Sequence, residues 1–207
     1  MKRVYLLFLG LILAVVPALQ AEDGATAMQR IGAEVAALKL GLGDYCIGQT
    51  LNAQQQVIAQ RNAITKTIKG SYKFQDGEVF VVVDEAKDMV IGLYKKNDEA
   101  SRDDVKKMVG ELMMRFEEPT TMAHDKLIYW AFGRDGRISE ELFDLARNNG
   151  GEKVLATVKF SSDVPIAPKA VPEEDKKVDG STEEEIASMY VMISSNPLSK
   201  IFLSLNK

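Results

Sequence analysis

The chain has 207 residues, of which 46% are apolar, with 26 basic and 30 acidic side chains. This composition is typical of one globular domain with a true core. Lysines alternate with acidic residues along the sequence, whereas nucleic-acid binding requires a basic stripe, so nucleic acid is excluded as a partner. A single cysteine, Cys46, excludes a fold held by internal disulfides. We expect its thiol to be buried; the alternative is an exposed thiol that pairs with a second chain.

The first 21 residues have the pattern of a secretory signal peptide. Two basic residues precede an apolar run from Leu6 to Val16, and small residues follow it. The run is too short to span a bilayer, which requires about 20 apolar residues. We expect cleavage after Ala21, or alternatively after Ala18. The mature protein is then expected in the periplasm or outside the cell. An uncleaved N-terminal anchor is the other interpretation.

Composition and periodicity divide the remaining chain into four parts. We predict an N-terminal helical segment (22–66), an α+β core (67–162), a linker rich in proline and charge (163–181) and a C-terminal helical segment packed on the core (182–207).

Two helices are predicted in the N-terminal segment. The first covers 25–39, with apolar residues at helical spacing and Asp23 as its cap. Asn52 caps the second, which is expected to run to about Ile64 with a stripe of Val57, Ile58, Arg61 and Ile64.

Three strands are predicted to follow as an antiparallel meander. Residues 67–74 alternate between apolar and polar, which indicates a strand with one solvent-exposed face. Residues 79–83 are β-branched and apolar on both sides, which indicates an interior strand. Residues 89–94 form the third strand.

The clearest predicted element is a helix from Arg102 to Glu117. Ser101 and Asp104 provide a capping pattern at its start, and Pro119 stands just after its end. Six apolar residues recur at helical spacing and predict one face that packs on the sheet: Val105, Met108, Val109, Leu112, Met113 and Phe116.

Beyond this helix, residues 126–132 are apolar on both faces and predict a central strand that contains the only tryptophan. A short helix is expected from Ser139 to Asn148, and a half-exposed strand at 154–160.

The C-terminal segment is ambiguous. An acidic first turn and the stripe Ile186, Met189, Tyr190 and Ile193 favour a helix, although residues 190–193 are equally compatible with a strand. A last short element follows Asn196 and Pro197.

Together these elements predict an α+β fold with a mainly antiparallel sheet of about five strands, a helix packed on one face and flanking N- and C-terminal helices. Two strands are apolar on both sides, so the N-terminal helices or a second subunit, in a homodimer, must cover the other face.

Catalysis by imidazole would depend on His124 alone, because it is the only histidine. No Gly-x-Ser-x-Gly motif precedes it, so a turn residue or a partly buried, hydrogen-bonded histidine is the preferred interpretation. A metal site that needs two histidines is excluded.

The stretch Asp135 to Phe143 resembles the second half of a calcium loop, but the pattern lacks the ligands. With Gly136 in the invariant glycine position, the closing carboxylate would be Leu142 and only Asp135 would coordinate. A tight turn followed by a capped helix explains these residues better.

Four methionines lie close together in the sequence: Met108, Met113, Met114 and Met122. Thioethers bind Cu(I), so a soft-metal carrier is one hypothesis. Methionine is also a common core filler, and Met108 and Met113 already belong to the predicted apolar stripe.

Adjacent carboxylates occur at 117–118, 140–141, 173–174 and 183–185, each at a helix end or in the linker, where solvated surface is expected. The glycine pair Gly41 and Gly43 lacks the third glycine of a dinucleotide-binding loop.

The sequence therefore assigns no catalytic residue, cofactor or metal ligand. We expect an exported, non-enzymatic envelope protein that binds another protein or a small apolar ligand. The alternatives are a periplasmic hydrolase with carboxylates from distant segments, and a soft-metal carrier. A cleft that gathers such carboxylates would favour the enzyme, and an apolar groove or flat patch would favour binding.

Overall fold

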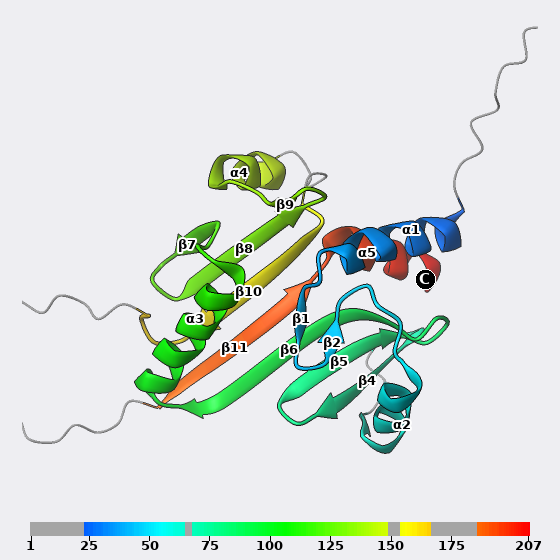
Figure 1. The fold of residues 1–207 in the computed structure, drawn as a ribbon, viewed down its shortest axis with the longest axis horizontal. Helices are drawn as coiled ribbons and strands as arrows, with labels where there is room; N and C mark the ends of the chain where they lie inside the picture. The colour runs from blue at the N-terminus through cyan, green and yellow to red at the C-terminus, as the bar shows by residue number, and fades with distance from the viewer. Residues whose placement is uncertain (1–22, 65–67, 149–153, 167–185) are drawn as a thin grey trace, which may run out of the picture.

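The computed structural model describes residues 23–64, 68–148, 154–166 and 186–207. It contains a large antiparallel sheet with helices around it, which confirms the α+β class (Figure 1). The predicted number of about five strands is wrong, because nine strands join in the main sheet. The predicted signal peptide and most of the 163–181 linker lie outside the described residues.

Every strand pair in the main sheet is antiparallel. In spatial order the strands are β3 (Ala63–Ile64), β4 (Ser71–Asp76), β5 (Val79–Asp84), β6 (Met89–Ala100), β11 (Ala187–Ser194), β10 (Ala156–Ser162), β8 (Leu127–Gly133) and β7 (Thr121–Ala123), and β9 (Gly136–Arg137) also pairs with β8. A separate hairpin joins β1 (Gly41–Leu42) and β2 (Tyr45–Cys46). The thiol of Cys46 in β2 is only partly buried, short of the full burial that we predicted.

The described helices are α1 (Gly24–Ala37), α2 (Ala53–Arg61), α3 (Arg102–Phe116), α4 (Glu140–Asn148) and α5 (Asn196–Leu205). The predicted caps are confirmed. Asp23 accepts a hydrogen bond from the Thr26 amide at 2.8 Å, and Asn52 and Ser101 each form a reciprocal capping box. Sequence-local signals therefore determine where these helices begin.

Strand β11 corrects the preferred prediction of a helix in the C-terminal segment. Ala187, Met189, Val191 and Ile193 are buried, while the residues between them are exposed or half-buried. That period of two matches a strand, and the stretch pairs with β6 on one side and β10 on the other. The free energy of two long-range pairings outweighs the local helical pattern.

The predicted order of the meander is confirmed, because β4, β5 and β6 are consecutive neighbours and β5 is an interior strand. The first strand begins at Ser71 and not at residue 67, because residues 68–70 form a turn that leaves Ile68 exposed. The predicted central position of β8 is wrong. Strand β8 has β10 on one side and only the short strands β7 and β9 on the other, so it lies near an edge.

One face of the sheet is covered by α3 and the β1–β2 hairpin. Phe116 of α3 contacts the ring of Trp130, and Tyr45 of β2 contacts Phe74 of β4. The buried residues of α3 are Val105, Val109, Leu112 and Phe116. Met108 is only half-buried and Met113 is exposed, so the buried stripe is narrower than predicted.

Helix α2 differs from its prediction. It ends at Arg61, not near Ile64, and Ala59 is its only buried residue. Val57 is exposed, because the helix lies at the edge of the sheet beside β4 (Figure 1).

Helices α1 and α5 lie against each other at one end of the sheet (Figure 1). A Cβ atom at Gly24 would come within 2.6 Å of Leu205 Cδ2, which places the start of α1 beside the end of α5. Within the described residues, no helix combines the length and the apolar character that a membrane span requires.

Candidate functional site

Two hollows of similar volume lie on the described part of the chain, and the one with the more apolar lining lies where four elements meet: α1, the β8–β9 turn, the start of α4 and the start of α5. It has a volume of about 760 Å³, within the range of roughly 300–1,000 Å³ that is typical of ligand pockets. We call it the groove site. Its lining residues are Ile31, Glu34, Gly133, Arg134, Asp135, Gly136, Arg137, Ile138, Ser139, Leu142, Leu155, Asn196, Pro197 and Lys200.

Apolar side chains come to the groove site from α1, from α4 and from the residue just before β10. Ile31 and Leu155 are buried there, and Leu142 of α4 is 38% exposed. Leu142 presents apolar surface to solvent at a concave position, which is where a ligand would gain most by covering it.

The helix ends that border the groove site follow from local sequence. Ser195 caps α5 through a hydrogen bond from the Leu198 amide, and Pro197 lies in the first turn, where its missing N–H is tolerated. Ser139 accepts a hydrogen bond from the Leu142 amide at the start of α4. These caps place Asn196, Pro197 and Ser139 at the rim.

An ion pair links two walls of the groove site. Arg134 Nε in the β8–β9 turn lies 2.9 Å from Glu34 Oε2 in α1, and Arg30 Nη1 lies 3.1 Å from the other oxygen of the same carboxylate. Surface pairs of this kind stabilise a protein by less than about 1 kcal/mol. Their effect here is to orient the turn against α1.

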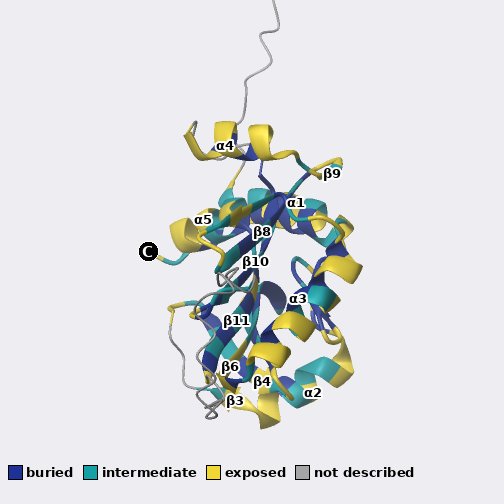
Figure 2. Cartoon of the chain, turned by 90° about the vertical axis from the view of Figure 1, so that its left-hand side faces the viewer, coloured by how far each residue is buried: buried dark blue, intermediate teal, exposed yellow. Residues whose placement is uncertain are grey.

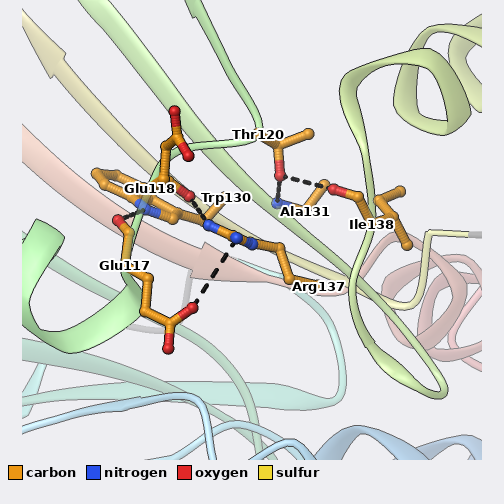
Figure 3. Close-up of polar contacts among 7 residues, drawn as sticks. All are labelled: Glu117, Glu118, Thr120, Trp130, Ala131, Arg137 and Ile138. Atoms are coloured by element: carbon orange, nitrogen blue, oxygen red, sulfur yellow. Dashed lines mark hydrogen bonds and ion pairs between the residues drawn. The ribbon is translucent and has the colours of Figure 1, made fainter.

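A second set of contacts joins β9 and the residue after it to the segment after α3 (Figure 3). The guanidinium of Arg137 donates to the Glu118 carbonyl, and its Nη2 lies 3.9 Å from the Glu117 carboxylate. The Thr120 hydroxyl donates to the Ile138 carbonyl at 3.3 Å and accepts from the Ala131 amide at 3.0 Å. We call the segment 117–120 with these contacts the clamp. It holds one wall of the groove site in place.

The clamp contains an unusual backbone conformation at Glu117, with φ 63° and ψ −150°. Glycine adopts this region readily, and other residues do so at a cost. The indole N–H of Trp130 donates to the Glu117 carbonyl at 3.0 Å and thereby helps to hold it (Figure 3). Pro119 marks the end of α3 in the sequence, but no sequence signal indicates the strained residue.

His124 does not belong to the groove site. It is exposed in the turn between β7 and β8, where both His124 and Asp125 have positive φ. The Lys126 amide donates to the Ala123 carbonyl across this turn. The prediction of a turn residue is therefore confirmed.

Asp135 does line the groove site, and it lies in the β8–β9 turn as the sequence predicted. Gly136 has a φ of 108°, a conformation that favours glycine. No group of three or more His, Cys, Asp or Glu side chains in the described ranges has a metal-binding arrangement.

The four methionines of the soft-metal hypothesis do not come together at one place. Met113 and Met122 line a smaller hollow between α3 and β7, whereas Met108 contacts the core. Met114 is 82% exposed on the outer side of α3 and lines none of these hollows.

Among the adjacent carboxylates that the structure describes, several make contacts within the protein. Glu117 and Glu118 belong to the clamp, and Glu140 accepts a hydrogen bond from the Thr121 hydroxyl. The pairs at 173–174 and 183–185 lie outside the described residues. Gly43, with φ 56°, lies in the turn between β1 and β2.

Two carboxylates from distant segments, Glu34 and Asp135, do line the groove site. Both oxygens of Glu34 are already engaged by guanidinium groups, so this carboxylate orients the walls and is poorly placed to exchange protons with a substrate. In the groove site the geometry therefore fits binding better than acid–base chemistry. The other hollow, of about 750 Å³ between β6 and α3, gathers more carboxylates, but Glu78 and Asp98 there pair with Lys95 and Lys96, and Asp104 belongs to the capping box of α3.

Comparison with known proteins gives no family: no family model, curated protein or solved structure matches this chain.

Proposed function

We propose that this chain is an exported, non-enzymatic protein of the cell envelope that binds a small, mainly apolar ligand in the groove site. The observation that supports this most is that the exposed Leu142 and the buried Ile31 and Leu155 line one concavity of about 760 Å³. Polar groups at the rim, such as Asn196 and Ser139, would orient a ligand rather than supply most of its affinity.

Binding of the neutral fluorescent probe N-phenyl-1-naphthylamine tests the site. We expect saturable binding by the wild-type protein, and about fivefold to tenfold weaker binding by Leu142→Gln, because the variant loses part of the apolar contact. Leu145→Gln is the matched control, since Leu145 lies on the same helix at 53% exposure and does not line the groove.

Equal affinities for the two leucine variants would refute the groove site as the place of binding. The hydrolase alternative has its own measurement, because Glu34→Gln and Asp135→Asn would then abolish turnover of a substrate while leaving probe binding intact.

The export part of the proposal rests on the leader pattern of residues 1–21. Mass spectrometry of the native protein should give an N-terminus at Glu22, or at Leu19 for the alternative cut. Retention of Met1 in a cytosolic fraction would refute export.

A further inference from the structure

A continuous row of large side chains crosses the face of the sheet opposite α3. Directly paired residues on neighbouring strands share a face, and the pairings join Phe80 to Tyr94, Tyr94 to Met192, Met192 to Lys159 and Lys159 to Tyr129. These five residues come from β5, β6, β11, β10 and β8. We call them the cross-sheet row.

Two lysines lie over the rings of this face. Lys159 Nζ is 5.7 Å from the ring centroid of Tyr129 and 5.2 Å from that of Tyr190. Lys73 Nζ is 5.9 Å from the ring centroids of both Phe80 and Tyr94. A hydrogen bond with Tyr190 raises the pKa of Lys159, so its ammonium group is charged at neutral pH.

This face is partly accessible, because the row residues other than Met192 are half-buried rather than buried. Figure 2 shows α2 and α3 on the other side of the sheet. Helix α4 reaches the row only at its β8 end, where Phe143 contacts Tyr129. Met192, in the middle of the row, is 38% exposed. Within the described ranges, neither Lys73 nor Lys159 forms an ion pair with a carboxylate.

The spacing of the two lysines indicates the size of the partner. Their strands, β4 and β10, are four strand spacings apart in the sheet, or about 19 Å at about 4.8 Å per spacing. This is the spacing of the backbones, and the Lys73 ammonium group reaches toward β6, where it donates to the Tyr94 hydroxyl at 3.3 Å. An extended segment that lies across the row contacts both lysines.

The rings argue against a nucleic acid. Phe80 and Tyr94 stack on each other, with centroids 4.6 Å apart and planes 5° from parallel, and lysines cover further ring faces. Bases bind such a surface by stacking on free ring faces. Side chains of a protein partner can instead pack against the ring edges and against Met192, without free ring faces.

We propose that the cross-sheet row, with Lys73 and Lys159 at its two sides, is a docking surface for an acidic segment of a partner protein. Its carboxylates pair with the two ammonium groups, and its apolar side chains cover Met192 and Tyr94. This surface is separate from the groove site.

Poly-L-glutamate is a defined acidic probe for this surface. In low salt we expect binding to the wild-type protein, weakened at least about fivefold in the double variant Lys73→Gln/Lys159→Gln. The control Lys106→Gln/Lys107→Gln removes the same charge from exposed positions on α3 and should change affinity less than twofold. Near-UV circular dichroism should show that both double variants are folded.

Methyl NMR of the methionines locates the contact. The Met192 methyl signal should shift with the probe, while those of Met113, Met114 and Met122, which are exposed elsewhere, remain in place. The Leu142→Gln variant should bind the probe normally. No binding, equal weakening by the two double variants, or an unshifted Met192 would overturn the proposal, as would equally tight binding of a single-stranded oligothymidylate.

Discussion

The indole of Trp130 holds the carbonyl of Glu117 through a 3.0 Å hydrogen bond, and this contact joins the sheet to the end of α3. Trp130 is fully buried, so its N–H has no access to water and requires an acceptor inside the protein. Glu117 supplies that acceptor while in a strained conformation. The strained backbone of Glu117 therefore provides the hydrogen-bond acceptor that the buried indole N–H of Trp130 requires.

Trp130→Phe should destabilise the protein by about 1–3 kcal/mol. The variant loses the hydrogen bond to Glu117 and leaves a smaller ring beside Phe116. Urea unfolding followed by circular dichroism measures the free energy of unfolding. Tyr129→Phe is the control on the neighbouring position of β8, and a loss as large in that variant would contradict the assigned role of the indole.

Glu117→Gly should stabilise the protein, or at least not destabilise it, because glycine adopts φ 63° and ψ −150° without the cost of about 1–3 kcal/mol carried by other residues. Greater flexibility of glycine in the unfolded chain offsets part of this gain. Glu118→Gly, one residue along the chain, serves as the comparison in the same urea assay. A marked destabilisation of Glu117→Gly alone would refute strain at this residue.

The fold was predictable where signals are local. The capping boxes at Asn52 and Ser101, and the proline after α3, are patterns within a few residues, and the helices begin where they indicate. Strand β11 was not predictable in this way. Residues 187–194 have apolar residues at helical spacing and also an apolar–polar alternation that fits a strand. The pairing of this strand with β6 and β10 decides between them, and those partners are about 30 to 100 residues away in the sequence.

The groove site was not predictable, since its residues lie in segments far apart in the chain. The turn at Asp135 and Gly136 and the starts of elements at Ser139 and Asn196 were identified beforehand, but as local structure and not as parts of a binding surface. Ile31 and Leu142 each have an ordinary helical spacing, and nothing local indicates that both line one concavity. The short strands β7 and β9 similarly exist only through their pairing with β8.

Leu112→Asp should prevent folding. Leu112 is buried in the face of α3 that packs on the sheet, and an unpaired carboxylate there adds a desolvation cost of several kcal/mol to the lost apolar burial. Met114→Asp, two residues later on the outer side of the same helix, should fold normally. Soluble yield and the near-UV circular dichroism spectrum distinguish the two, and a folded Leu112→Asp protein would show that α3 is misplaced.

Asp84, at the end of β5, provides a prediction about pH. Burial raises the pKa of its carboxyl above the ordinary value of 3.8, against the opposing effect of the Ala86 amide hydrogen bond. A group with a raised pKa in the folded state binds its proton more tightly there than in the unfolded chain. Its contribution is therefore most favourable below pH 3.8 and is lost as the pH rises through the folded-state pKa.

Asp84→Asn removes this titration, so the free energy of unfolding of the variant relative to wild type should increase between about pH 3 and pH 7. Urea unfolding at several pH values measures the difference. Asp103→Asn, at a side chain that is 90% exposed in α3, is the control and should not show that rise. A difference that stays constant with pH, or decreases, would mean that burial does not disfavour the Asp84 carboxylate.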